Sequence, residues 1–142
     1  MKINEIISQD PVYLSPRTTL LEAAQMMKIL DAAMLPVCDR ERLVGTITDR
    51  DITIRAVAKG CDANHTPVSD VMTDDPIYCF DDQAVDEVAG LMREHQIHRL
   101  PVLNRQQRLV GAVSLEDLDA RGGREEMFAD LPDPIAVGLL AG

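Results

Sequence analysis

The sequence predicts an α+β fold of two pseudo-symmetric units, each with the order strand, helix, strand, strand, helix. An internal repeat is the first observation that predicts it: Asp10–Tyr13 returns as Asp75–Tyr78, and Leu35–Val37 returns as Leu100–Val102. The second is that strand-like apolar runs and helical spacing follow one another in the same order in both copies. The length of 142 residues suits one ordinary domain, which argues against a large two-domain enzyme.

Each copy opens with a proline and a short predicted strand, over 11–14 and 76–80. A helix follows because apolar residues then fall at helical spacing: Leu20, Ala24, Met27 and Leu30 in the first copy, and Val85, Val88 and Met92 in the second. Thr18 or Thr19 is the expected cap of the first helix, and Asp81 or Asp82 that of the second.

Two apolar strands come next in each copy, over 34–38 and 43–48 and over 100–103 and 109–114. Closing helices are predicted to begin near Asp49 and Leu115, and to end at Gly60 and at Gly122-Gly123. These boundaries predict a first unit over 1–60, a linker over 61–69, a second unit over 70–123 and an extension over 124–142. The extension is rich in apolar residues, so we expect it to dock on the module or on a partner subunit.

Composition excludes several classes of partner. The chain has 14 Lys and Arg against 24 Asp and Glu, a net charge of −10, which repels phosphate backbones and anionic lipid. The N-terminus lacks the apolar run of a signal peptide, and the longest apolar stretch, 135–141, is too short to span a bilayer. The 3 cysteines include no CxxC pair, which favours free thiols in a reducing compartment. We therefore expect a cytoplasmic protein that binds neither nucleic acid nor membrane.

One motif recurs after the last strand of each copy. Gly45–Asp51 and Gly111–Asp117 share the form Gly-x-aliphatic-Thr/Ser-x-x-Asp. A hydroxyl and a carboxylate at a helix N-terminus suit an anion and a vicinal diol, respectively. The alternative is a structural capping box, with Thr48 or Ser114 as the cap. The occurrence of the motif at both symmetric positions favours a function.

This doubled motif, with Leu-Pro-Val before it and Asp-Pro-aliphatic opening each copy, resembles the CBS domain pair, or Bateman module, over roughly residues 3–120. In its length and in the sequence of residues 48–52, Thr-Asp-Arg-Asp-Ile, the chain resembles small stand-alone bacterial CBS-pair proteins, including the hypoxic-response type. The resemblance implies that clefts between the two units hold adenosyl ligands such as AMP, ADP, ATP or S-adenosylmethionine. It also implies a homodimer.

The resemblance further implies a role for individual residues. Asp51 with Thr48, and Asp117 with Ser114, are expected to lie at ribose and phosphate. Adenine is expected against Val12 and Tyr13 for the Asp117 site, and against Ile77 and Tyr78 for the Asp51 site. His98 and Arg99 are expected to face phosphates. The first copy has Ala33 and Met34 instead, so phosphate binding there depends on Arg50 or Arg55.

Other reactive side chains have simpler interpretations. The pair His95 and His98, and the pair Cys61 and His65, lack the further ligands that a metal site needs. Cys38 and Cys79 lie at apolar strand positions, where a cysteine is usually an inert core residue. We therefore expect no metal, no cofactor and no catalytic residue.

The leading hypothesis is a non-catalytic regulatory module that senses an adenosyl ligand and signals its occupancy to an effector protein that the sequence does not identify. The alternative is a ligand-free structural or adaptor homodimer. An enzyme that uses a bound nucleotide as its substrate is a third hypothesis, which no visible set of nucleophile, base and oxyanion donor supports.

Overall fold

The structure is a computed structural model that describes residues 1–7 and 11–118. The chain divides into two compact units, and each unit contains one copy of the repeat. Of the described residues, 12–76 form the first-copy unit, whereas 1–7 and 11 join 77–118 in the second-copy unit. Within the described part of the chain, no helix is both long and apolar enough to cross a membrane.

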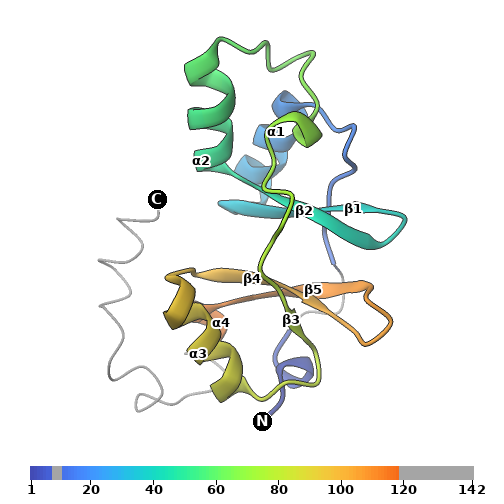
Figure 1. The fold of residues 1–142 in the computed structure, drawn as a ribbon, viewed down its shortest axis with the longest axis vertical. Coiled ribbons are helices and arrows are strands. Elements are labelled where there is room, and N and C mark those ends of the chain that lie inside the picture. The colour runs from blue at the N-terminus through green and yellow to red at the C-terminus, as the bar shows by residue number, and fades with distance from the viewer. Residues whose placement is uncertain (8–10, 119–142) are drawn as a thin grey trace. The chain divides into compact units, whose positions relative to one another are not determined.

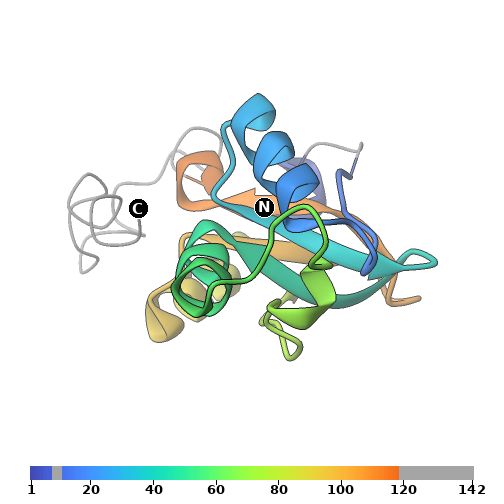
Figure 2. The same ribbon diagram turned by 90° about the horizontal axis from the view of Figure 1, so that it is seen from above.

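The first-copy unit is an antiparallel sheet with its helices on one face (Figure 1). Helix α1 (Leu20–Leu30) precedes strands β1 (Met34–Asp39) and β2 (Arg42–Thr48), and α2 (Asp49–Asp51) follows. The helical path continues from α2 through a π-helical stretch, Ile52–Ala56, and a 3₁₀ turn, Val57–Lys59. We call the whole path from Asp49 to Lys59 the closing helix. Figure 2 shows α1 and the closing helix next to each other over the strands.

Isolated bridges extend this sheet at both edges. Thr73 pairs with Thr46 beside β2, and Leu14 pairs in parallel with Val37 of β1. The predicted opening strand over 11–14 is therefore reduced to one bridge. The reason is the turn that follows, in which the Thr18 amide donates to the Ser15 carbonyl and bends the chain away.

The ends of the helices in the first-copy unit follow the sequence prediction. Thr19 caps α1, because its hydroxyl accepts from the Glu22 amide at 3.2 Å while the Glu22 carboxylate accepts from the Thr19 amide at 3.1 Å. Leu20, Ala23 and Met27 bury the inner face of α1. Gly60 ends the closing helix in the left-handed conformation, at φ 77°, which favours glycine.

The second-copy unit repeats this plan around a three-stranded sheet. Its elements are β3 (Cys79–Phe80), α3 (Val85–His95), β4 (Arg99–Leu103), β5 (Leu109–Ser114) and α4 (Leu115–Asp117). Strand β3 runs parallel to β4, and β4 pairs antiparallel with β5, placing Arg99 opposite Ser114. Leu100, Val102 and Val113 point into a core that α3 covers with Val88 and Met92. The architecture is therefore α+β in both units, as predicted.

The start of α3 corrects one prediction. Its N-cap is Ala84, not Asp81 or Asp82, and no side chain caps it. Ala84 is 65 residues after Thr19, so the second copy keeps the position of the cap but loses its hydroxyl. The backbone of the N-terminal segment compensates, because the Met1 carbonyl accepts from the Val85 amide at 2.9 Å.

The leading segment of each copy packs in the unit of the other copy. The 3₁₀ turn Ile3–Glu5 lies in the second-copy unit, where Ile3 is buried and its amide donates to the Gln83 carbonyl. The 3₁₀ turn Val68–Asp70 lies 65 residues later, and Val68 is buried in the first-copy unit.

This exchange differs from the expected division at residues 60 and 70. Residues 61–69, expected as a linker, are attached to α1, since the Leu20 amide donates to the Thr66 carbonyl at 2.9 Å. The physical reason is that a short apolar lead completes the core of the copy that it reaches. Gly122-Gly123 and the extension 124–142 lie outside the described residues.

Candidate functional site

The second-copy motif lies where β5 ends and α4 begins. The Asp117 amide donates to the Ser114 hydroxyl oxygen at 3.1 Å, and the Ser114 amide donates to Asp117 Oδ2 at 3.1 Å. Val113 points into the core, so strand alternation turns Ser114 toward the opposite face of the sheet. These two bonds fix the hydroxyl and the carboxylate while leaving the hydroxyl proton and Asp117 Oδ1 for another partner.

Two basic residues lie beside this motif. Arg99 is the cross-strand partner of Ser114, and the His98 carbonyl accepts from the Leu115 amide at 3.0 Å. The Arg99 side chain is exposed and that of His98 is half-buried. The register of β4 and β5 therefore places Arg99 opposite the Ser114 hydroxyl, while the His98 backbone is tied to the start of α4. Such a set of donors suits an anion with hydroxyl groups attached.

The first-copy motif has the same backbone geometry. The Asp51 amide donates to Thr48 Oγ1 at 2.9 Å, and the Thr48 amide donates to Asp51 Oδ2 at 3.1 Å. The Asp49 amide donates to the Ala33 carbonyl at 3.0 Å, which matches the bond made by Leu115. Both motifs are therefore capping boxes, the structural alternative considered for them. A capping box and a ligand site are compatible, because each box uses one carboxylate oxygen and one hydroxyl lone pair.

The surroundings of Asp51 differ from those of Asp117. Asp51 is 8% exposed, and Thr73 donates to its Oδ2 at 3.4 Å while Arg55 Nε lies 3.8 Å from its Oδ1. Arg55 Nη1 also donates to the carbonyls of Val71 and Met72, at 3.2 and 3.3 Å. Arg55 is thus held by its own unit, and so is the carboxylate. A ligand at Asp51 has to compete with these contacts.

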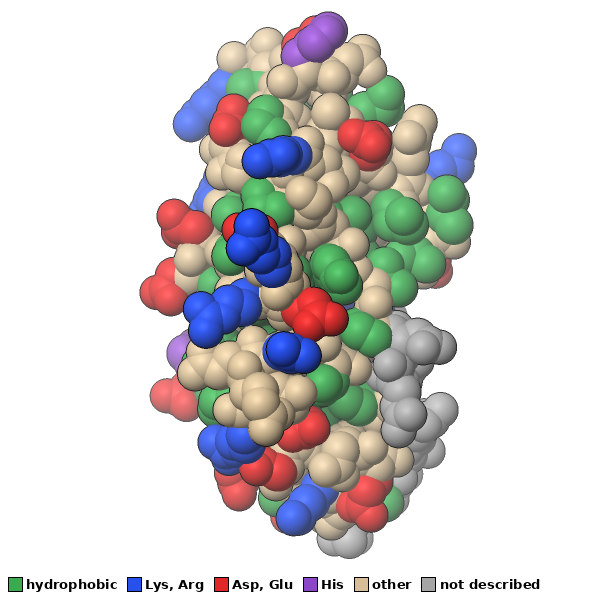
Figure 3. Space-filling view, turned by 90° about the vertical axis from the view of Figure 1, so that its right-hand side faces the viewer, with side chains coloured by type: hydrophobic (Ala, Val, Ile, Leu, Met, Phe, Trp, Pro, Cys, Tyr) green, Lys and Arg blue, Asp and Glu red, His purple; other side chains and the backbone are tan. Residues whose placement is uncertain are grey.

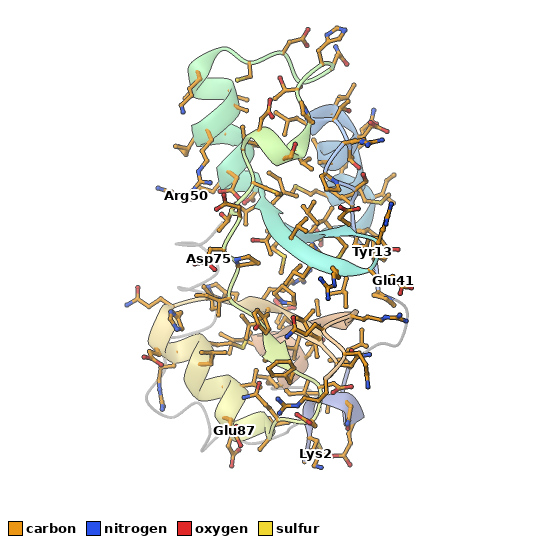
Figure 4. All side chains as sticks on the ribbon, turned by 45° about the vertical axis from the view of Figure 1, so that its right-hand side comes forward. Lys2, Tyr13, Glu41, Arg50, Asp75 and Glu87 are labelled. Carbon is orange, nitrogen blue, oxygen red and sulfur yellow. The ribbon has the colours of Figure 1, made fainter. Side chains whose placement is uncertain are left out.

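The remaining predicted residues of the first copy are dispersed. Met34, the cross-strand partner of Thr48, is buried and uncharged where Arg99 is exposed and charged. Arg50 is exposed on α2, and Figure 4 shows it on the opposite side of the first-copy sheet from Tyr13. Of the residues expected to replace the basic pair, Arg55 contacts the motif carboxylate and Arg50 is exposed beside it.

The predicted adenine contacts are surface side chains. Val12 and Tyr13 lie in the first-copy unit and are 44% and 43% exposed. Tyr78 lies in the second-copy unit at 39% exposure, next to half-buried Ile77. Cys79 points into the core, so Tyr78 points to the opposite face of the sheet. The pairing of each set with the motif of the other copy stays a prediction.

The histidine and cysteine side chains bear on two other kinds of site, a metal site and a reactive thiol. Among residues 1–7 and 11–118, no three His, Cys, Asp or Glu side chains come together as a metal site. His65 pairs with Asp62 at 2.7 Å, and this hydrogen bond lowers the pKa of Asp62. Burial raises the pKa of the Cys38 thiol to about 11 and that of Cys79 to about 12. Neither buried thiol is an activated nucleophile.

Sequence reasoning missed the role of Thr73 and the reason for Gly45. Thr46 and Thr73 exchange two backbone hydrogen bonds of 2.9 Å, which bring residues 72–73 against β2. A Cβ on Gly45 would lie 2.7 Å from both Met72 Sδ and the Thr73 carbonyl oxygen. The signal in the sequence was Gly45 itself, because a glycine in a strand can indicate that another segment of backbone packs closely against it.

Comparison with known proteins gives a consistent result. Residues 3–57 and 68–121 each match the family model of the CBS domain. The CBS domain-containing protein YhcV of Bacillus subtilis is 37% identical over 116 residues, which are 82% of this chain and 81% of that protein. Hypoxic response protein 1 of Mycobacterium tuberculosis is 36% identical over 115 residues, or 80% of each chain.

Solved structures agree with these relatives. Hypoxic Response Protein I with two coordinated zinc ions has a TM-score of 0.78 at 33% identity, covering 85% of this chain and 98% of its own. Protein PAE2072 from Pyrobaculum aerophilum, complexed with AMP, has a TM-score of 0.77 at 28% identity over 92% and 98%. The CBS pair of protein MJ0100, with 5′-methylthioadenosine and S-adenosyl-L-methionine, reaches 0.74 at 31% identity over 87% and 96%.

Proposed function

This chain belongs to the CBS-domain family, with two CBS units, and we propose that it is a non-catalytic regulatory module that binds an adenosyl ligand. One observation carries the proposal: both motifs present a hydroxyl and a carboxylate fixed by the same reciprocal hydrogen bonds. A site whose donors and acceptors are already in place loses little entropy when a ligand binds. Neighbouring structures with AMP or with S-adenosylmethionine support this ligand class.

The second-copy motif is the stronger half-site in this proposal. Asp117 Oδ1 accepts from the ribose hydroxyls, while Ser114 and the α4 N-terminus lie near the phosphate. His98 and Arg99 neutralise phosphate charge, and charge-assisted hydrogen bonds are about twice as strong as neutral ones. Val12 and Tyr13 contact the adenine of this ligand.

The first-copy motif binds the same class of ligand more weakly. Thr48 and Asp51 offer the same two groups, with adenine against Ile77 and Tyr78. Arg50 supplies a positive charge, whereas Arg55 is occupied by Val71 and Met72. A ligand here gains no equivalent of His98 and Arg99 because Ala33 and Met34 replace them.

In this proposal the bound ligand signals through a change in the conformation of the protein and not through a catalysed reaction. Ligand binding favours one conformation of the module, and an effector protein responds to the conformation that it meets. The adenine nucleotide is then a regulatory ligand and not a cofactor. No reaction is assigned to the site in this proposal.

A homodimer is the second part of the proposal, and one surface supports it. Helix α1 exposes Leu21, Ile29 and Leu30, with Ile29 77% exposed, and the closing helix exposes Ile54 and Val57. Figure 3, which faces the side of the molecule away from the closing helix, shows hydrophobic side chains gathered at one edge of the first-copy unit in its upper half. Large exposed apolar patches usually mark interfaces, and two-fold pairing is the commonest form. The adaptor alternative keeps this dimer and lacks the ligand.

The second copy contributes less to that surface than the sequence suggests. Val85, Met92 and Leu118, apolar residues of its helical segments, are buried within their own unit. The positions in α3 that match Leu21, Ile29 and Leu30 are Asp86, Glu94 and His95, all exposed. Light scattering at micromolar concentration should give the mass of a dimer. Ile29→Glu should weaken the dimer while the matched Glu94→Gln should not, and a wild-type monomer would contradict this part.

Isothermal titration of the full chain with AMP, ATP and S-adenosylmethionine tests the ligand proposal. Heat that saturates with at least one adenosyl ligand is the expected result, and Asp117→Ala should weaken that binding. No heat with any of the three at millimolar concentration would overturn the sensor and leave the adaptor homodimer. Nucleotide turnover that survives purification and is lost in Asp117→Ala would overturn the non-catalytic assignment.

A further inference from the structure

A row of interacting side chains in the second-copy unit lies outside both motifs. The rings of Tyr78 and Phe80 meet edge to face, with centroids 5.6 Å apart and planes at 88°. The Arg105 guanidinium lies 4.1 Å from the centroid of Phe80. Asp82 holds that guanidinium through two hydrogen bonds of 2.7 Å. Each member of the row is therefore fixed by the next, and Tyr78 is its half-exposed end.

Local structure explains why these side chains meet. Cys79 points into the core, so its two neighbours in the chain, Tyr78 just before β3 and Phe80 within it, project away from the core. Because β3 pairs with β4 through Phe80 and Leu103, the turn that follows β4 lies next to Phe80. In that turn the Asn104 side chain accepts from the amides of residues 106 and 108, which fixes the backbone around Arg105.

The first copy has the tyrosine without its support. Tyr13 matches Tyr78, but Ser15 stands at the position of Phe80 and Arg17 at that of Asp82. Arg40 matches Arg105 and so keeps the guanidinium without the ring or the carboxylate. The repeat thus provides two half-exposed tyrosines, of which only Tyr78 is backed by a ring, a cation and an anion.

We propose that Phe80, Arg105 and Asp82 are positioning residues that hold the ring of Tyr78 ready to stack on the base of an adenosyl ligand. This inference rests on the proposed function and assigns roles to three residues outside the two motifs. A ring that is already held in place loses little rotational freedom when a base stacks on it. The base should gain more from Tyr78 than from Tyr13.

The interactions among Phe80, Arg105 and Asp82 contribute little stability but constrain the orientation of these side chains. Hydrogen bonds from Arg105 lower the pKa of Asp82, and those to Asp82 raise the pKa of Arg105. Both side chains are partly exposed, at 59% for Arg105 and 38% for Asp82, so water screens their attraction. The bidentate geometry and the cation–π contact therefore serve mainly to orient Phe80.

The test uses the absence of tryptophan and the presence of only 2 tyrosines. In a Tyr13→Phe background, Tyr78 is the sole source of tyrosine fluorescence. Arg105→Met keeps a long apolar side chain and removes the guanidinium, and Asp82→Asn keeps the shape and removes the charge. The matched control is Arg40→Met, the equivalent change in the first copy. Far-UV circular dichroism verifies that each variant folds.

Two readouts separate positioning from general stability. Without ligand, Arg105→Met and Asp82→Asn should raise the quenching of Tyr78 by acrylamide, while Arg40→Met should not. With ligand, both should weaken AMP binding at the Asp51 motif, whose proposed adenine contact is Tyr78, about two- to fivefold, the range expected for losing a cation–π contact. AMP binding at the Asp117 motif, whose proposed adenine contact is Tyr13, should stay unchanged. Both variants should leave binding of ribose 5-phosphate, which has no base, unchanged.

The outcomes distinguish this inference from the proposed function. Unchanged quenching and an unchanged ratio of AMP to ribose 5-phosphate affinity would overturn the positioning role, while AMP binding itself would still support the sensor. Equal weakening of both ligands would also overturn it, because a base platform acts on the base alone. Failure of the Tyr13→Phe parent and of the wild type to bind AMP would overturn the proposed function and this role with it.

Discussion

The two motifs have the same hydrogen bonds within them and different surroundings. Arg99 lies opposite Ser114, the His98 carbonyl bonds to the start of α4, and one Asp117 carboxylate oxygen has no partner among the described residues. Around Thr48 and Asp51 lie Ala33 and a buried methionine, and the carboxylate is contacted by Arg55 and Thr73. Duplication has thus produced one open motif and one that is tied into its own fold. The capping box preserves the helix start in both copies, so the divergence lies in the residues around the motif and not in the motif itself.

Removing each motif carboxylate is the strongest way to test this comparison. Asp117→Ala should weaken AMP binding about tenfold or more, since hydrogen bonds to a charged group contribute about 1.5–3 kcal/mol. Asp51→Ala should weaken it less but lower the melting temperature more, because it leaves Arg55 without its carboxylate. Calorimetric titration and thermal melts of both variants measure the two effects. A larger affinity loss at Asp51 would contradict the comparison.

The close approach of residues 72–73 to β2 gives the next largest effect. Gly45→Ala places a Cβ 2.7 Å from the Thr73 carbonyl oxygen, so the first-copy unit should lose about 1–3 kcal/mol of stability. Gly90→Ala is the matched control, because nothing lies within 4 Å of its Cβ and alanine favours the helix. Chemical denaturation should show Gly45→Ala destabilised and Gly90→Ala unchanged or more stable. Equal stability of Gly45→Ala and wild type would show that the contact is loose.

Making the second-copy site resemble the first should have a smaller effect. Arg99→Met copies the residue found at position 34 and should weaken AMP binding about fivefold, by removing one charge-assisted hydrogen bond. The salt dependence of binding should also decrease. Adenosine, which has no phosphate, is the control ligand and should bind both proteins equally. An equal loss for adenosine would show that Arg99 acts on the fold.

Thiol labelling gives the smallest effect and reports on each unit separately. Cys38 lies in the first-copy unit and Cys79 in the second, and burial raises their pKa values to about 11 and about 12. The neutral thiols thus stabilise the fold below the ordinary thiol pKa of about 8.5, and this contribution disappears as the pH rises toward the raised values. At pH 8 only the exposed Cys61 should react quickly.

Ligand should then change the slow labelling unequally. Binding at the second-copy motif stabilises that unit, so AMP should slow the labelling of Cys79 more than that of Cys38. Mass spectrometry of each cysteine peptide measures the rates. Equal protection of both would indicate that the two motifs bind alike, or that the units open together.

Much of the fold could be predicted from the repeat and from local rules. Thr19 as a cap, Gly60 as a terminator and the hairpins of both copies follow from capping, backbone conformation and strand alternation. The exchange of leading segments could not be predicted, because the apolar character of Ile3 and Val68 predicts burial without indicating which copy's core buries them. The cap of α3 was mispredicted because the Met1 carbonyl, distant in sequence, takes over that role.

The residues of the candidate site could be predicted from the sequence, but the contacts that their side chains make could not. The hydroxyl, the carboxylate and the missing basic pair of the first copy are all visible in the sequence. Whether Arg55 faces a ligand or its own backbone depends on contacts with residues 16 and 17 positions away. The support behind Tyr78 depends similarly on Arg105, which comes from a different turn.

Amide chemical shifts during an AMP titration test the central claim most directly, that the second-copy motif is the preferred adenosyl site. The amides of Ser114 and Asp117 take part in the capping box, and so do those of Thr48 and Asp51, so both motifs have equivalent reporters. The account predicts that the amides of Ser114 and Asp117 shift and saturate at lower AMP concentration than those of Thr48 and Asp51. Shifts that appear first at Thr48 and Asp51, or at neither motif, would contradict it.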